Sequence, residues 1–457
     1  GYIYPKSFRE RIKYAPQRQT LMQIAIADNQ NGLKLLAESD IFWDEIIEIK
    51  LIEGKTIVYD IAVPEHHNFV ANDIIVHNSY TMGVMAEEMA NLPTEIANRI
   101  AVLIVDTMGI YWTMKYPNEK DEDLLRSWDL PKKGLDVQIY TPAGFHQQYK
   151  DKGIPTDHSF TIRPAELDSS DWAGAFGVSI LDDLGIAIER TVEKTKEKFG
   201  DSYSIDDMVS IVKVDERLDE KTKLALENRL MATKEWGLFD VEGTPLKKII
   251  AGGQTTVLDI SCYTNWTIKC LVLGIICRRL MLERMESRKE EELEDVERGH
   301  SYFKSTIETN EGDLPIVWIM IDEAHEFLPK DYKTLSTDSL VAILREGRQP
   351  GVCLVLVSQQ PGQIHTDVLT QTDIIICHRI TARRDVDALN SMMQAYTSGN
   401  IQKYLNQLPT ERGSAVILDD NSERMFPIRT HPRFTWHGGE APTAVKPKST
   451  ALERLGL

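Results

Sequence analysis

After about residue 80 the chain is dominated by runs of consecutive apolar residues, without the alternation of a half-buried strand. Five such runs are AVLIVD ending at Asp106, TTVLDIS near residue 258, IVWIMID ending at Asp322, VCLVLVS ending at Ser358 and DIIICHRI from Asp373. A strand that is apolar at every position is covered on both faces, as in a parallel sheet. Helical stretches lie between the runs, so the pattern predicts an α/β fold with a doubly wound sheet.

The stretches between the runs predict helices over residues 80–89, 265–286 and 336–345. A block between about residues 165 and 250 carries amphipathic segments, over 181–198 and 216–236, and is predicted to be a helical insertion. The charge run 286–300 is interpreted as a solvated helix end or mobile loop. Residues from about 430 onward are rich in Pro, Gly and Lys and predict an extended tail.

Before residue 80 the pattern is different. Short β-type stretches, over 46–52, 56–63 and 69–76, are separated by turn-forming residues. They predict a small all-β segment, and the composition changes abruptly just after residue 78. The chain begins at Gly1 without a targeting signal and is interpreted as part of a longer polypeptide.

Composition narrows the classes of function. The 457 residues carry 52 Lys and Arg against 70 Asp and Glu, a net charge of -18, so any contact with nucleic acid must be local. The apolar runs are far shorter than the roughly 20 residues that span a bilayer, which predicts a soluble, cytoplasmic protein without membrane contact. Five cysteines without a CxxC pair predict buried thiols in a reducing compartment.

Residues 58–79, VYDIAVPEHHNFVANDIIVHNS, carry a first candidate chemistry. The side-chain amide of Asn78 can attack its own carbonyl carbon, which cuts the bond to Ser79 without water. His77 can polarise that carbonyl or protonate the leaving amine. The Ser79 hydroxyl can first accept the upstream segment as an ester.

This segment resembles the C-terminal end of an archaeal intein, with its Hint domain, over about residues 41–78. The resemblance implies that Asp60 and His67 assist proton transfers. A plain β-meander with a turn at Asn72 and Asp73 is the alternative. Residues 1–40 are interpreted as the end of an insert, such as a homing-endonuclease remnant, although no endonuclease acidic motif is present. The first intein nucleophile is absent from the chain, so splicing needs the upstream intein and N-extein portion as a partner.

A second candidate site is the sequence IMIDEAHEFLP, which places Asp322 and Glu323 at the end of an apolar run. Together with REGRQPGVCLVLVSQQP over 345–361, it resembles the HerA and FtsK type of hexameric translocase, over about residues 79–430. The resemblance implies a RecA-like P-loop ATPase sheet, with ATP and Mg²⁺ as ligands. Helicases of superfamily two also carry DEAH, but their companion motifs are not found in helicase order.

The same resemblance assigns roles to the candidate residues. Asp322 would hold Mg²⁺, Glu323 would be the catalytic carboxylate, Gln359 would sense the γ-phosphate, and Arg348 would act as a finger in a neighbouring subunit. A helix-terminal cation is the alternative for Arg348. Arg379, Arg383 and Arg384 are rival fingers, Asp106 either lies near the phosphates or caps a turn, and His325 is interpreted as structural.

No phosphate-binding GK[ST] loop that follows a strand and opens a helix occurs in the ATPase part. Gly54-Lys55-Thr56 lacks the preceding strand and first glycine, and is rejected. If the intein interrupts this loop just after its lysine, Ser79 is the splicing nucleophile and, after ligation, the loop serine that binds Mg²⁺. The helix over 80–89 is then the helix that directly follows the phosphate-binding loop, with its N-terminus towards the phosphates.

The sequence thus predicts an ATP-driven motor on double-stranded DNA that is active after splicing. The resemblance implies that it is a homo-oligomer and that the oligomer is a hexamer. Two alternatives stay open. One is a nucleotide-dependent coupling or scaffold ATPase that acts on protein partners, and the other is self-cleavage chemistry alone.

Overall fold

The computed structural model describes residues 79–299, 314–380, 383–393, 404–405, 407–409, 411, 413–419 and 424–439. The predicted β-type stretches before residue 79 lie outside these residues. Among the described residues, no helix is both long enough and apolar enough to cross a membrane.

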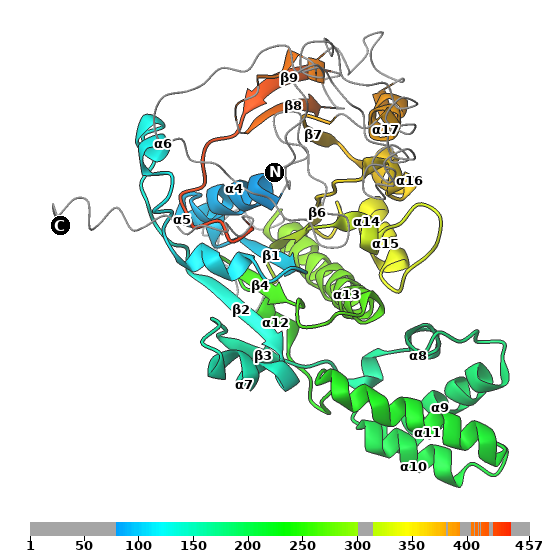
Figure 1. Ribbon diagram of the computed structural model, residues 1–457. Helices are drawn as coiled ribbons and strands as arrows, with labels where there is room; N and C mark the ends of the chain where they lie inside the picture. The colour runs from blue at the N-terminus through cyan, green and yellow to red at the C-terminus, as the bar shows by residue number, and fades with distance from the viewer. Residues whose placement is uncertain are drawn as a thin grey trace, which may run out of the picture. The chain divides into compact units, whose positions relative to one another are not determined.

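A six-stranded parallel sheet forms the centre of the described part (Figure 1). Across the sheet the strands are β3 (His158–Phe160), β2 (Val137–Pro142), β4 (Thr255–Asp259), β1 (Ile100–Asp106), β5 (Ile316–Ile321) and β6 (Val352–Leu356). Every neighbouring pair is parallel. The prediction of an α/β fold with a parallel sheet is therefore confirmed.

The central strand shows why the run was apolar at every position. Leu103 and Val105 point into one apolar cluster, whereas Val102 and Ile104 point into a second cluster on the opposite face. All four side chains are buried. Burying each such side chain contributes about 1.5–3 kcal/mol, so a polar residue at any of these positions would destabilise the sheet.

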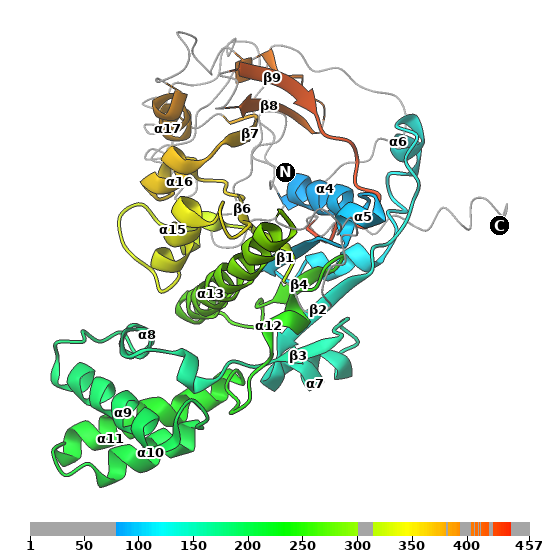
Figure 2. The same cartoon turned by 180° about the vertical axis from the view of Figure 1, so that it is seen from behind.

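Helices cover both faces of the sheet (Figure 2). The face of Leu103 and Val105 packs against α12 (Leu246–Ile249), α13 (Trp266–Gly299), α15 (Thr337–Glu346) and α16 (Thr366–Gln371). The face of Val102 and Ile104 packs against α4 (Ser79–Ala90) and the 3₁₀ helix η1 (Tyr111–Lys115). Shorter elements in the connections are α5 (Thr94–Ala97), α6 (Glu122–Ser127), α7 (Ala143–Asp151), α14 (Ala324–Phe327), α17 (Arg383–Met393), η2 (Pro164–Glu166) and η4 (Pro361–Gln363).

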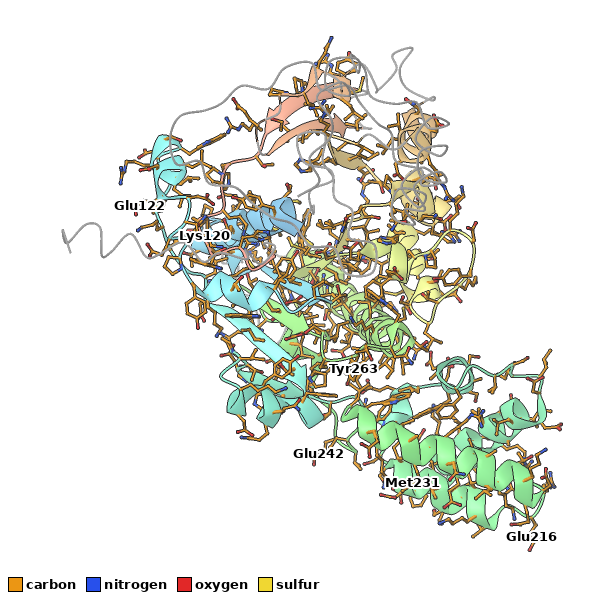
Figure 3. All side chains as sticks on the ribbon, viewed as in Figure 1. Lys120, Glu122, Glu216, Met231, Glu242 and Tyr263 are labelled. Carbon is orange, nitrogen blue, oxygen red and sulfur yellow. The ribbon has the colours of Figure 1, made fainter. Side chains whose placement is uncertain are left out.

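The predicted helical insertion is present. It contains α8 (Ser169–Ala175), α9 (Asp183–Phe199), α10 (Ile205–Val214), α11 (Glu220–Ala232) and η3 (Thr233–Trp236). Capping boxes at Asp168 and Ser204 fix where α8 and α10 begin. Tyr263, labelled in Figure 3 with Met231 of α11, donates its hydroxyl to the carbonyl of Trp236 at 2.8 Å and ties the insertion to the end of β4.

One strand lies elsewhere than predicted. The run from Asp373 forms β7 (Ile374–His378), which pairs antiparallel with β8 (Ser414–Asp419), and β8 pairs with β9 (Arg424–Arg429). Among the described residues, β7 belongs to this three-stranded sheet and not to the parallel one. The apolar run is explained by a separate cluster that contains Cys377 and Val416, because a pattern of burial records coverage and not the identity of the partner strand.

The described residues after β9, 430–439, form no helix, and they are not a free tail. Residues 431–439, here called the strap, lie against α4. Arg433, Phe434 and Thr435 are almost fully buried. The predicted solvated helix end over 286–299 is the last part of α13, where Arg288 pairs with Glu291 at 3.1 Å.

Candidate functional site

Acidic side chains gather at the carboxyl edge of the parallel sheet. The adjacent strands β4 and β1 end in Asp259 and Asp106, which are register partners, and Asp322 directly follows β5 on the other side of β1. Parallel strands end at the same edge, so the predicted apolar-run-to-acid pattern produces one acidic edge. This edge of an open α/β sheet is where ligands commonly bind.

The turn after β5 holds the predicted acid pair. The Asp322 carboxylate accepts the backbone N–H of Glu323 at 2.9 Å. The backbone N–H of Ala324 donates to the carbonyl of Val357 at 2.8 Å, which fixes the turn to the end of β6. Glu323 has φ 51° and ψ 44°, a left-handed conformation that is unfavourable for a residue with a side chain. Such strain is of order 1–3 kcal/mol and is common at functional sites.

The second acid meets the predicted glutamine. Gln359 donates its side-chain N–H to a Glu323 carboxylate oxygen at 2.5 Å. Burial and the neighbouring Asp322 raise the pKa of Glu323 to about 7, while the bond from Gln359 lowers it. A carboxyl group with a pKa near neutrality accepts and releases protons readily, which suits general base catalysis.

His325 packs beside this pair. Its Nδ1 lies 3.1 Å from the hydroxyl of Ser358 and 3.6 Å from a Glu323 oxygen. Its Nε2 lies 3.4 Å from the side-chain amide of Gln360. Burial lowers the pKa of His325, which favours the neutral ring. These contacts join the end of β6 to the acid pair, consistent with a structural role.

Sequence reasoning missed a tyrosine at the first acid. The hydroxyl of Tyr111, in η1, donates to the Asp322 carboxylate at 3.3 Å, and the ring is buried. Tyr111 lies in the DTMGIYW stretch after the first strand, and nothing in its spacing distinguishes it from a core aromatic residue.

Asp106 caps the turn that follows β1, which is one of the two alternatives predicted for this residue. Its carboxylate accepts the backbone N–H groups of Met108 at 3.2 Å, Gly109 at 2.7 Å and Tyr111 at 2.8 Å. It is completely buried. Burial and the adjacent Asp259 raise the pKa of Asp106 above its usual range.

A lysine was also missed beside these acids. Lys269 of α13 donates to the carbonyl of Thr107 at 2.9 Å, and burial lowers its pKa although Asp106 and Asp259 oppose that shift. Asp259 accepts the hydroxyl of Ser261 at 2.6 Å. A signal for Asp259 was available, because its strand ends in an acid just as the strand before Asp106 does.

Helix α4 begins at the same part of the sheet. Its first residue is Ser79, whose side chain lies outside the described part. Thr81 Oγ1 lies 2.8 Å from Nε2 of His378, at the end of β7. Met82 shares an apolar cluster with Met320, before Asp322, and with Val357, before Gln359. The N-terminus of α4, a favourable position for anions, therefore lies near the ends of β5, β6 and β7.

The candidate arginines are distributed differently. Arg348 is exposed in the turn before β6, at the amino edge of the sheet and opposite to Glu323 and Gln359. The structure does not bring it to the acid pair of its own chain. Arg379 directly follows β7, close to the start of α4, and Arg384 is exposed on α17. The side chain of Arg383 lies outside the described part.

The splicing residues lie outside the described residues as well. They are Asp60, His67, His77 and Asn78. Their roles stay predictions from the sequence.

The described residues fit Mg²⁺ only as an ion that is bound together with a nucleotide. Within the described ranges, no group of three or more His, Cys, Asp or Glu side chains is placed to hold a metal ion. Mg²⁺ bound to a nucleotide needs only one or two carboxylates, because phosphate and water provide its other ligands. Asp322 fits that role, whereas the described side chains at this edge do not form a site for a metal held by protein ligands alone.

Comparisons with known proteins give one match to a family model and several similar proteins. Residues 6–78 match the family model of the intein splicing domain. A probable DNA double-strand break repair helicase HerA of Methanocaldococcus jannaschii is 30% identical over 155 residues, which are 32% of this chain and 27% of the relative. The HerA of Pyrococcus furiosus is 29% identical over 145 residues, 30% of this chain and 26% of that protein. The chain thus spans about a quarter of the HerA relatives.

Two further relatives complete the comparison. A replicative DNA helicase DnaB of Rhodothermus marinus is 47% identical over 72 residues, 16% of this chain and 7% of that protein. The solved structure of VirB4 of Thermoanaerobacter pseudethanolicus is 12% identical, with a TM-score of 0.44, and the match covers 78% of this chain and 87% of VirB4. A structural likeness at this level says nothing of function.

The described part has a parallel sheet with an acid pair directly after β5, and the chain is similar to HerA helicases over about a third of its length. The chain thus combines a segment that matches the intein splicing domain with a part that is similar to HerA helicases.

Proposed function

We propose that this chain is the C-terminal portion of an intein-containing, ATP-dependent DNA translocase or helicase, whose nucleotide site is completed by splicing at Ser79. One observation carries the proposal. The intein match ends at residue 78, and the next residue begins α4, whose first turn contacts the end of β7 and shares an apolar cluster with the end of β5, before the acid pair. A single junction therefore serves both the splicing chemistry and the nucleotide site.

In splicing, the Ser79 hydroxyl attacks the acyl carbon at the upstream junction and forms an ester. The bond from that acyl carbon to the first residue of the intein breaks, and this residue leaves with the proton that the hydroxyl loses. The side-chain nitrogen of Asn78 then attacks the Asn78 carbonyl carbon. A C–N bond forms within a succinimide, the peptide bond to Ser79 breaks, and His77 protonates the departing amine. The ester shifts to the freed amine of Ser79 as a normal peptide bond. Asp60 and His67 assist the proton transfers.

In ATP hydrolysis, Glu323 orients the attacking water and accepts its proton, and Gln359 holds the carboxylate of Glu323 in place at 2.5 Å. Asp322 and the Ser79 hydroxyl would hold the Mg²⁺ of a bound nucleotide, which would supply charge stabilisation at the phosphates. Tyr111 fixes the orientation of Asp322 by its hydroxyl. The N-terminus of α4 faces the anionic phosphates.

The position of Arg348 at the amino edge favours a homo-oligomer. An arginine finger contributes by reaching the phosphates directly. Arg348 lies at the edge of the sheet opposite to the acid pair of its own chain, so as a finger it would act at a site in another subunit. A hexameric ring is the assembly that the HerA resemblance implies. Arg379, after β7, is the rival finger for the site of its own chain.

Double-stranded DNA is the proposed partner of the assembled motor. The curated relatives are named as DNA double-strand break repair helicases. A net charge of -18 means that the DNA contact must be a local basic surface. DNA-stimulated hydrolysis that weakens steeply with added salt is expected, because each phosphate contact releases a counterion. Stimulation by a protein partner and not by DNA would favour the coupling or scaffold ATPase instead.

The ATPase assignment is tested by Glu323→Gln in the spliced product. The variant should retain ATP binding and lose turnover by at least about 100-fold, because it removes the general base. Glu326→Gln, one helical turn away, is the matched control and should retain turnover. Equal turnover in Glu323→Gln and the unsubstituted product would refute the assignment.

The splicing assignment has its own test. Asn78→Ala removes the attacking amide, so cleavage of the bond before Ser79 should stop. Mass spectrometry measures this cleavage. Continued cleavage in that variant would contradict cyclisation. Cleavage with no ATP hydrolysis in any ligated product would leave self-cleavage as the only activity.

A further inference from the structure

The strap contacts both structural elements that carry the proposed Mg²⁺ ligands. Helix α4 begins with Ser79, and η1 contains Tyr111, whose hydroxyl donates to the Asp322 carboxylate at 3.3 Å. Both elements pack on the same face of the parallel sheet. The strap, red in Figure 1, passes from β9 to α4. It is therefore in contact with both sides of the proposed site.

The first set of strap contacts is with α4. The backbone N–H of Arg433 donates at 2.7 Å to the hydroxyl of Tyr80, which directly follows Ser79. The Arg433 guanidinium lies against Gly83, where an added Cβ would be 2.6 Å away, and it pairs with the Glu87 carboxylate at 3.1 Å. Residues three and four positions apart share one side of a helix, so the strap runs along one side of α4 from its first turn.

The second set of strap contacts is with η1. The backbone N–H of Trp436 donates at 2.7 Å to the carbonyl of Tyr116, directly after η1. The Thr113 hydroxyl lies 2.7 Å from the carbonyl oxygen of Ile110 and 3.0 Å from that of Trp436, and donates to both. A Cβ added at Gly438 would lie 2.8 Å from the Ile110 carbonyl oxygen. A side chain at position 438 would therefore push the strap away from η1.

The two sets of contacts are made by neighbouring, buried residues. Arg433, Phe434 and Thr435 are almost fully buried, and Trp436 follows them directly. The backbone N–H groups of Phe434 and Thr435 both donate to the Glu87 carboxylate. A displacement of η1 relative to α4 would leave buried polar groups without partners at one end of the strap, which is unfavourable. The strap therefore resists changes in the spacing of the two elements.

We infer that the strap sets the spacing between Ser79 and Asp322, and that Arg433 and Thr113 are positioning residues for the Mg²⁺ of a bound nucleotide. This inference rests on the proposed function for the identity of the ligand. Arg433 acts on Ser79 through α4, and Thr113 acts on Asp322 through η1 and Tyr111. By linkage, docking of the strap and binding of the ligand between Ser79 and Asp322 favour each other equally.

Hydrogen exchange in the 457-residue chain, without nucleotide, tests the bridge itself. Thr113→Val keeps the shape of the side chain, so the direct packing of η1 stays and only the hydroxyl is lost. The α4 amides should exchange at least about 5-fold faster in this variant, the loss expected for one buried hydrogen bond. Arg433→Lys keeps a cation beside Glu87 and should raise exchange of the Tyr116 amide, across the strap in the other direction.

Thr195→Val is the matched control for these exchange measurements. Thr195 is also buried, and its hydroxyl donates to the carbonyl of Thr191 at 2.6 Å within α9, in the helical insertion. This variant should leave exchange in α4 and η1 unchanged. Unchanged exchange of the α4 amides in Thr113→Val would overturn the inference. An equal rise in α11 would also overturn it, because it would show a general loss of stability. If Arg433→Lys does not fold, Thr113→Val decides alone.

Binding of a non-hydrolysable ATP analogue to the spliced product, measured by titration calorimetry, is the second readout. In Thr113→Val and in Arg433→Lys, the Mg²⁺ concentration for half-maximal binding should rise at least about 5-fold. Binding of the analogue in EDTA should not change, because the spacing of Ser79 and Asp322 matters only to the ion. Equal weakening with and without Mg²⁺, which a merely structural role would give, would overturn the inference.

Failure of this inference and failure of the proposed function give different results. An unsubstituted spliced product that does not bind the analogue refutes the proposed nucleotide site, and with it the positioning of its ligands. Binding with the same Mg²⁺ dependence in every variant refutes the positioning role of the strap alone.

Discussion

The buried ion pair between α4 and the strap gives a prediction whose size follows from the contacts. Glu87 of α4 and Arg433 of the strap are 0% and 1% exposed. The Glu87 carboxylate accepts Nε of Arg433 at 3.1 Å and the backbone N–H groups of Phe434 at 3.0 Å and Thr435 at 3.2 Å. Arg433→Met removes the cation and leaves the carboxylate buried among neutral donors.

Removing one member of a buried pair costs about 3–5 kcal/mol, because the remaining charge is uncompensated. Three donors stay on Glu87, namely the backbone N–H groups of Phe434 and Thr435 and the Thr435 hydroxyl, and they place the expected loss at the lower end of this range. Since 1.36 kcal/mol corresponds to a factor of ten, a loss of about 3 kcal/mol lowers the equilibrium constant for docking of the strap on α4 roughly 160-fold.

Native-state hydrogen exchange of the α4 amides measures this loss directly. Arg126→Met is the matched control, because Arg126 pairs with Glu122 at 3.2 Å on the exposed surface and such pairs contribute about 0.3–0.5 kcal/mol. A loss in Arg433→Met no larger than in Arg126→Met would refute the view that the strap holds α4 through this pair.

Three further predictions concern the site and its surroundings. The pKa of Glu323 is raised to about 7, so turnover of the spliced product should rise with pH through that value. Gln359→Ala should move this rise to higher pH, because it removes a hydrogen bond that lowers the pKa of Glu323. An unmoved pH–rate profile in the variant would contradict the contact between Gln359 and Glu323. The raised pKa values of Asp106 and Asp259 mean that the folded state binds more protons, so stability should fall as the pH rises above the ordinary carboxyl value of 3.8. Asp259→Asn should flatten this dependence between the ordinary carboxyl value of 3.8 and about pH 7, which is the raised pKa of Asp106. An equally steep dependence in urea unfolding would count against this prediction. Gly83→Ala places a Cβ 2.6 Å from the Arg433 guanidinium, so thermal unfolding should show that the free energy of unfolding falls by about 1–3 kcal/mol. Unchanged stability would mean that the strap moves away from α4 without cost.

Much of the fold could be predicted because the relevant signals are local. The apolar runs that became β1, β4, β5 and β6 each reflect coverage on both faces, and the acids that follow them mark one edge of the sheet. The pairing of Glu323 with Gln359 was accessible for the same reason, since both residues directly follow strands. Position at a strand end is a property that the sequence displays.

The remaining features depend on contacts between distant segments. Arg433 lies 346 residues from Glu87, and no local pattern connects a Pro-, Gly- and Lys-rich stretch with a particular helix. The partner of β7 was equally hidden, because burial gives no information about which strand lies alongside. In the sequence, Tyr111 cannot be distinguished from a core aromatic residue. Only the structure shows that its hydroxyl donates a hydrogen bond to Asp322.

The central claim is that joining a segment to Ser79 completes the nucleotide site. The most direct test is ATP binding and turnover by two proteins measured side by side, the 457-residue chain and the product with the upstream extein segment joined to Ser79. We expect binding and turnover in the joined product only. Turnover of ATP by the 457-residue chain at the rate of the joined product, or a folded joined product that does not bind ATP, would contradict the claim.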